Sequence, residues 1–212
     1  RIRINISIIN NSAIGNNGRG GGLRCTTNSD PILVNVLISD NTASQEGGGV
    51  FCYNSDPSFI NVTISGNVSS IDDGGGMFIK SNSNVNLLNT VIGWNESNEI
   101  EFSSVDDSSA ITILYSNIAG GLDSIITNDN GTVSWGDGSQ GNDPHFVNPD
   151  SSNYHLLASS LCINAGHPDS LESDGSIVDM GVFPYLNSYS GPVWFVETTG
   201  NDTIGTGSSD SP

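Results

Sequence analysis

Glycine triplets recur along this chain at equal steps. They begin at Gly20, Gly47 and Gly74. An asparagine column repeats with them: Asn11, Asn41, Asn67 and Asn95. Three residues before each asparagine stands an isoleucine, and a fifth copy keeps the isoleucine but has Gly121 in place of the asparagine: Ile8, Ile38, Ile64, Ile92 and Ile118. A period of about 20 to 50 residues is typical of solenoids, propellers and other repeat arrays. The fold must therefore stack one small unit about five times.

Each unit contains short runs of alternating apolar residues, such as Ile60, Val62 and Ile64, bounded by Gly, Asn, Ser and Asp-Pro. Such runs are too short for helices and predict β-strands. A strand-rich unit of about 26 to 30 residues predicts an all-β, right-handed parallel β-helix (β-solenoid) of five or more coils with a C-terminal cap. Propeller blades are longer, at about 40 to 50 residues. In this fold the isoleucine column should stack inward, and the asparagine column should form an internal amide ladder.

The regularity of the repeat divides the chain into three parts. Residues 1–121 are predicted to form the coils. Residues 122–190 should form irregular final coils and the cap, with 131–149 covering the open end of the stack. Residues 191–212 read as a linker and a strand. Repeat length varies only between each asparagine and the next glycine triplet, which predicts one corner with surface loops of variable length.

Composition limits the partners of the chain. Five Lys and Arg against 23 Asp and Glu give a net charge of −18. Nucleic acid is excluded as a partner, because its phosphates are bound through Lys and Arg. No apolar run is long enough for a membrane-spanning helix. Cys25 and Cys52 occupy the same repeat position, so we expect them to stack as small inward side chains, with a disulfide between them as the alternative.

The motif GGGVFCYNSDP at 47–57, followed by NVTISGN at 61–67, resembles the right-handed parallel β-helix domains of large secreted or surface-exposed bacterial proteins. These include adhesin-like proteins and proteins similar to polymorphic outer-membrane proteins. Four later blocks are similar to the closing segment of such domains: 142–149, 153–156, 160–166 and 179–181. Residues 193–212 are similar to the opening of a further domain. The resemblance implies a secreted or cell-surface location, in a family that mixes structural proteins with carbohydrate-active enzymes.

Catalytic residues are not expected. A polygalacturonase-like site would need several motifs on successive coils, and only paired aspartates occur, at 72–73 and 106–107. A polysaccharide lyase would need a basic residue near bound Ca²⁺. The basic residues are few: Arg1, Arg3, Arg19, Arg24 and Lys80. We therefore predict that the chain is not an enzyme and that variants of Asp72 or Asp106 would abolish no reaction.

The one cofactor that the sequence suggests is calcium. Asp129, Asp137 and Asp143 lie in turn-rich segments with many oxygen ligands, but none completes a known calcium loop. No cofactor is required by this interpretation. His145, His155 and His167 lack the spacing of a zinc site and are expected to be structural. The tryptophans are better explained by packing than by sugar stacking, although stacking stays an alternative: Trp94, Trp135 and Trp194.

The sequence thus predicts a non-catalytic, extracellular structural module. Copies should associate end to end, by stacking of coils or by addition of the strand at 193–199 to a neighbouring copy. The alternative is a β-helix that binds or cleaves polysaccharide. A groove that carries aromatic and acidic side chains together would favour this alternative.

Overall fold

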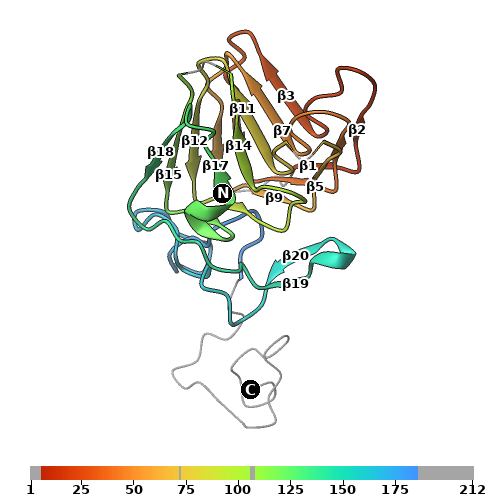
Figure 1. Cartoon of the computed structure of the whole chain (residues 1–212). Coiled ribbons are helices and arrows are strands. Elements are labelled where there is room, and N and C mark those ends of the chain that lie inside the picture. The colour runs from red at the N-terminus through yellow and green to blue at the C-terminus, as the bar shows by residue number, and fades with distance from the viewer. Residues whose placement is uncertain (1–5, 72, 106–107, 186–212) are drawn as a thin grey trace, which may run out of the picture.

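The computed structural model describes residues 6–71, 73–105 and 108–185 (Figure 1). This part of the chain forms a parallel β-solenoid of about five turns, as predicted. Its helical content is limited to two short 3₁₀ turns, η1 (Gly121–Ser124) and η2 (Pro149–Ser151). No helix among the described residues is long and apolar enough to cross a membrane.

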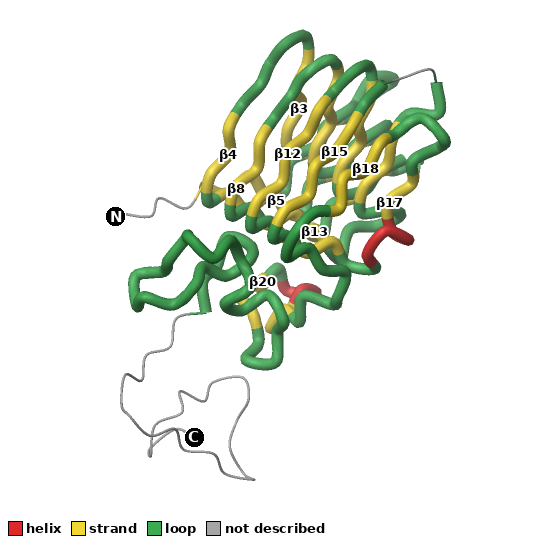
Figure 2. Tube along the Cα trace, turned by 90° about the vertical axis from the view of Figure 1, so that its left-hand side faces the viewer, coloured by secondary structure: helices red, strands yellow, loops and turns green. Residues whose placement is uncertain are grey.

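Four parallel sheets make the sides of the solenoid, and each coil contributes at most one strand to each sheet. Sheet A contains β1 (Ile6–Ile9), β5 (Val36–Ser39), β9 (Thr63–Ser65), β13 (Val91–Ile92) and β16 (Asn117–Ile118). Sheet B contains β2 (Ser12–Ala13), β6 (Thr42–Ala43) and β10 (Val68–Ser69). Sheet C contains β3 (Leu23–Thr26), β7 (Val50–Tyr53), β11 (Met77–Lys80), β14 (Ile100–Phe102) and β17 (Ile125–Ile126). Sheet D contains β4 (Ile32–Val34), β8 (Ser58–Ile60), β12 (Asn84–Leu88), β15 (Ala110–Leu114) and β18 (Thr132–Trp135), which lie side by side in Figure 2.

The predicted isoleucine column is confirmed. Its members are successive register partners along sheet A: Ile8, Ile38, Ile64, Ile92 and Ile118. The last four are fully buried. Together with inward residues of sheets C and D they form one apolar core through the stack. Cys25 and Cys52 also stack in register, as buried free thiols.

The predicted amide ladder is confirmed as well, and its geometry is directional. The side-chain oxygen of each asparagine accepts two bonds from the asparagine one coil earlier. Asn41 Oδ1 accepts the backbone N–H of Asn11 at 2.9 Å and its Nδ2 at 3.0 Å. The same pair of bonds joins Asn41 to Asn67 and Asn67 to Asn95. Because a buried amide without partners is costly, the ladder holds the corner between sheets A and B in one conformation.

Glu99 ends this ladder. The Nδ2 of Asn95 has no asparagine beyond it, because Gly121 stands at that repeat position, and it donates to Glu99 Oε2 at 2.6 Å. Only 8% of Glu99 is exposed. Burial raises the pKa of its carboxyl to about 7, despite the hydrogen bonds from Asn95. A buried glutamic acid therefore accepts the last hydrogen bond of the asparagine ladder.

The ladder and the short distance between coils leave no space for a Cβ at several positions, and the glycine triplets meet this requirement. The first glycine of the central triplet, Gly47, has φ +71°, a conformation that disfavours side chains. A Cβ on the third, Gly49, would lie 2.6 Å from the Gly76 carbonyl oxygen and 2.9 Å from Asn67 Nδ2. One glycine makes the turn, and the others leave room for the neighbouring coil and for the amides.

A second apolar column of the repeat faces outward. Its members stack in register along sheet D: Val34, Ile60, Leu88 and Leu114. Val34 is 44% exposed and Leu114 is 37% exposed. The residue that follows each of them has positive φ, for example 55° at Asn35, and this turn reverses the direction in which the next side chains point. Alternation alone does not reveal such a corner.

The first part of 131–149 forms an irregular last coil on the open end of the stack. Residues 132–135 form β18, and Gln140 still pairs with Asn117 as part of the last coil. Residues 143–185 then run back along the outer side of sheet A, where β19 (Phe146–Asn148) and β20 (Asn153–Leu156) form an antiparallel pair (Figures 1 and 2). Residues 143–185 are the lateral cover of sheet A.

Apolar contacts and long-range hydrogen bonds hold this lateral cover. Its buried side chains pack on Leu37 and Val91, which point outward from sheet A: Phe146, Tyr154, Leu156, Cys162, Met180 and Val182. The Val182 N–H donates to Thr63 Oγ1 at 3.0 Å, and the Gly181 N–H donates to the Asn89 carbonyl at 2.8 Å. A sheet with apolar residues on both faces needs such a cover.

Asn67→Ala should destabilise the protein by about 2 to 4 kcal/mol, because the change removes the acceptor of the buried Asn41 N–H and one of the two hydrogen bonds made by Asn41 Nδ2 and by Asn95 Oδ1. Urea unfolding followed by circular dichroism measures the loss. The control is Asn16→Ala on an exposed loop, which should change stability by less than about 0.5 kcal/mol. Equal losses in the two variants would contradict the role of the ladder.

Glu99→Gln should stabilise the protein at pH 8 and have little effect near pH 4.5. The folded pKa of about 7 lies above the ordinary 4.5, so the wild type loses stability as the pH rises through this window. The loss approaches about 3 kcal/mol above pH 7, and glutamine removes it. Unfolding of both proteins across this pH range gives the measurement, with the exposed Glu96→Gln as control. A stability difference that does not grow with pH would refute the assignment.

Candidate functional site

The candidate site is a surface hollow of about 210 Å³ where the lateral cover meets the corner between sheets A and B. We call it the Trp94 hollow. Its lining residues are Asp40, Gly66, Val68, Trp94, Glu96, Pro149, Asp150 and Tyr154. The first five come from three successive coils, and the last three come from the segment around η2 and β20. The solenoid and its cover therefore build the hollow together.

One turn column of the solenoid supplies its floor. Asp40, Gly66 and Trp94 occupy equivalent positions immediately before the asparagine ladder, with φ values of 57°, 68° and 64°. Positive φ is unfavourable for a bulky residue. Trp94 holds this conformation while 49% of it stays exposed. The turn thus projects an indole from the surface instead of packing it into the core.

Gly66 makes room for the contact at the centre of the hollow. The Tyr154 hydroxyl donates to Asp40 Oδ1 at 2.9 Å, between residues 114 positions apart. A Cβ at Gly66 would lie 2.7 Å from the same Asp40 oxygen and closer still to the tyrosine hydroxyl. Burial and the bond to Asp40 raise the pKa of Tyr154 well above its ordinary value, so the hydroxyl keeps its proton and its role as donor.

The hollow is electrostatically negative. Asp40, Glu96 and Asp150 line it, and no Lys or Arg is among its lining residues. Ionised carboxylates are acceptors only, so the site offers acceptors and an aromatic face to a ligand that brings donors.

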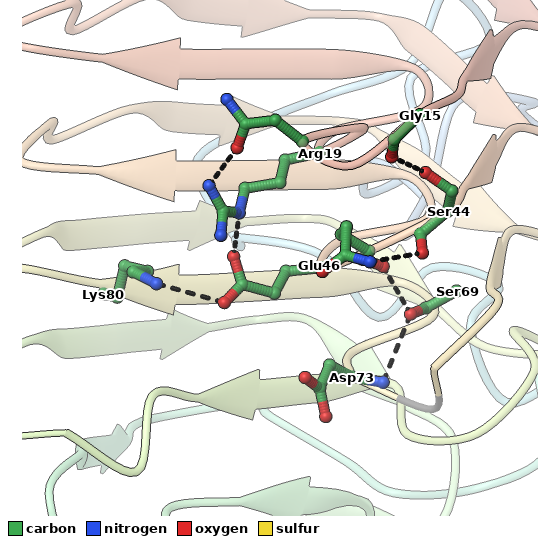
Figure 3. Close-up of polar contacts among 9 residues, drawn as sticks. Gly15, Arg19, Ser44, Glu46, Ser69, Asp73 and Lys80 are labelled. Carbon is green, nitrogen blue, oxygen red and sulfur yellow. Dashed lines mark hydrogen bonds and ion pairs between the residues drawn. The ribbon is translucent and has the colours of Figure 1, made fainter.

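A second cluster gathers the cations of the described chain on the outer side of sheet C. Arg19, Arg24 and Lys80 each lie 5.5 to 5.9 Å from the centroid of the Phe51 ring, within cation–π range. Figure 3 shows Arg19 and Lys80 reaching the same carboxylate, that of Glu46, with Lys80 Nζ at 3.0 Å from Oε1. Phe51 is only 1% exposed, so the ion pairs cover the ring.

This cluster connects the corners that vary in length. Ser44 Oγ donates to the Gly15 carbonyl at 2.7 Å, and Ser69 Oγ donates to the Gln45 carbonyl at 2.7 Å (Figure 3). The Asp73 N–H in turn donates to Ser69 Oγ at 3.2 Å. Loops from three coils are thereby joined to one another, and the cations already have partners. The cluster stabilises the structure and leaves no open site.

The aspartates proposed for calcium do not converge. In the described residues, no group of three or more His, Cys, Asp or Glu side chains is arranged to hold a metal ion, so Asp129, Asp137 and Asp143 form no such group. Asp143 Oδ1 instead accepts the His145 N–H at 2.8 Å. Asp72 and Asp106, considered for catalysis, lie outside the described residues.

The histidines and the second tryptophan make packing contacts. His145 Nδ1 lies 3.0 Å from Ser159 Oγ, His155 stacks on Phe183 and His167 meets the edge of Tyr115. Trp135 packs on the core of the stack. Trp194 lies outside the described residues. Of the tryptophans that sequence analysis considered for sugar stacking, Trp94 is therefore the exposed one within the described chain.

Sequence reasoning missed the acidic lining of the hollow. Asp40 stands one residue before Asn41, as Trp94 does before Asn95, so their shared turn column was visible in the repeat. Tyr154 and Asp150 could not be found in this way, because they lie outside the repeat. The path of the C-terminal segment brings them to the hollow.

Comparisons with known proteins return no match: no family model, no curated protein and no solved structure is significantly similar to this chain.

Glu46→Gln should destabilise the protein by about 1 to 3 kcal/mol, between the values typical of exposed and of buried ion pairs. The change removes the anion that Arg19 and Lys80 share over a buried ring. Thermal and urea unfolding give the measurement, with the exposed Glu96→Gln as control. High salt should reduce the difference in unfolding free energy between the wild type and Glu46→Gln, because salt screens partly exposed charges. A variant as stable as the wild type would show that the cluster contributes nothing.

Proposed function

We propose that this chain is a non-catalytic, extracellular structural module, a rigid β-solenoid of a cell-surface or secreted protein. The observation that supports the proposal is the continuity of the internal ladders. The isoleucine column runs through five strands of sheet A, and the asparagine ladder runs through four coils to its end at Glu99. A solenoid in which each coil bonds to its neighbours suits a stiff spacer.

Association of copies end to end is part of this proposal. Within the described residues, β1, β3 and β4 have a partner strand on one side only. Ile32 and Ile6 at this edge are 71% and 52% exposed. An edge with free N–H and C=O groups pairs readily with another strand. The strand that we propose to supply this pairing, at 193–199, lies outside the described residues.

Polysaccharide binding is a second candidate function. It is favoured by the Trp94 hollow, which carries an exposed indole beside carboxylates. The strongly negative charge of the chain disfavours nucleic acid and uronate polymers. Cleavage of polysaccharide is not part of the proposal. Calcium binding at Asp129, Asp137 and Asp143 stays a prediction.

Removal of residues 191–212 tests the assembly. The full-length chain should form concentration-dependent oligomers in analytical ultracentrifugation, because the donated strand satisfies the open edge of a neighbour. The truncated chain should be monomeric at the same concentrations, with an unchanged circular dichroism spectrum. Oligomers of the truncated chain would exclude strand addition, and a monomeric full-length chain would exclude assembly altogether.

A further inference from the structure

We propose that the Trp94 hollow binds one uncharged pyranose unit of a neutral polysaccharide. The proposal deepens the second candidate function and is independent of the structural role and of assembly. It rests on the aromatic surface, the hydrogen-bonding groups and the size of the hollow.

The aromatic surface is Trp94. Tryptophan is on average a highly buried residue, yet 49% of this one is exposed at the edge of a concave surface. The face of an indole carries negative potential. One face of a pyranose ring consists of C–H groups with slight positive charge, so the two faces are complementary. A turn residue with positive φ, 64° here, holds the indole at the corner of the coil.

The hydrogen-bonding groups suit a ligand with several donors, such as the hydroxyls of a sugar. The carboxylates of Asp40, Glu96 and Asp150 accept bonds and donate none. Sugar hydroxyls are donors at several positions around a ring, which suits acceptors that come from separate chain segments. These carboxylates are not arranged as a group that would hold one metal ion. The Tyr154 hydroxyl bonds one Asp40 oxygen at 2.9 Å and so fixes the orientation of that carboxylate.

Size and charge narrow the ligand further. A volume of about 210 Å³ is below the range of about 300 to 1,000 Å³ typical of pockets for drug-sized ligands, so the hollow suits a single ring. The rest of a polymer would continue outside. Because carboxylates line the hollow without any Lys or Arg, a uronate would be repelled. Pyranoses without an acidic group remain, and the uncharged members of this class are the ligands that we propose.

Isothermal titration calorimetry with the full 212-residue chain tests the proposal. The neutral probes are cellohexaose, maltohexaose, laminarihexaose, xylohexaose and mannohexaose. The charged probes are hexagalacturonate, hexameric chitosan and choline. At least one neutral probe should bind saturably, with an affinity that changes less than twofold between low and high salt, because no charge pair forms. Binding of the charged probes alone, or of no probe, would overturn the proposal.

Matched variants locate the binding. Trp94→Ala should weaken it at least tenfold, and Trp94→Phe should restore most of it. The control Ile14→Ala removes another exposed apolar side chain, 82% exposed, and should leave affinity unchanged. Circular dichroism of the same samples reports whether the variant is folded, and ultracentrifugation reports its assembly. A loss of binding can therefore be distinguished from unfolding and from a change in assembly. Binding that survives Trp94→Ala in a folded protein would place the ligand elsewhere and refute the site.

Discussion

The close spacing of successive coils, about 4.8 Å in a parallel sheet, is the constraint on which the rest of the structure depends. At this distance a side chain at the third triplet position would collide with the next coil, and glycine is the residue that fits. The same distance lets each asparagine bond to the next one through its backbone and side chain together. Glycine and asparagine therefore recur together in successive coils, because the glycine leaves the space that the asparagine amide occupies. The ladder that they form ends at Glu99, the point where the repeat stops supplying an amide.

Because the inward positions are occupied by these ladders, variation is confined to turns and outer faces. Two kinds of outer feature result. On sheet C, loops of variable length join three coils through Arg19, Glu46 and Lys80, and they close over Phe51. On sheet A, the outer face is apolar and is covered by the C-terminal segment. The Trp94 hollow lies at the edge of that cover, where a turn column of the solenoid meets a segment far away in the sequence.

Much of the stack could be predicted because its contacts recur at fixed sequence separation. The register of Ile38 with Ile64, the bond from Asn41 to Asn67 and the pairing of Cys25 with Cys52 all follow from the repeat. Two features could not be read in this way. Val34 points outward while Val36, two residues later, is buried in the core, because Asn35 between them has positive φ and turns the chain. The alternating sequence pattern does not show that turn. The lateral course of residues 143–185 depends on apolar contacts that have no period.

The sequence by itself determined the parallel stack, its inward columns and its internal amide ladder, since each is a relation between a residue and its equivalent one coil away. Only the tertiary structure decided where the C-terminal segment packs, and hence that Tyr154 meets Asp40 across 114 residues. It also decided that Trp94 stays exposed while Trp135 packs on the core. The physical reason is that backbone pairing between coils is local and repetitive, whereas the docking of the segment depends on the shape and apolarity of a whole face that exists only after the stack has formed.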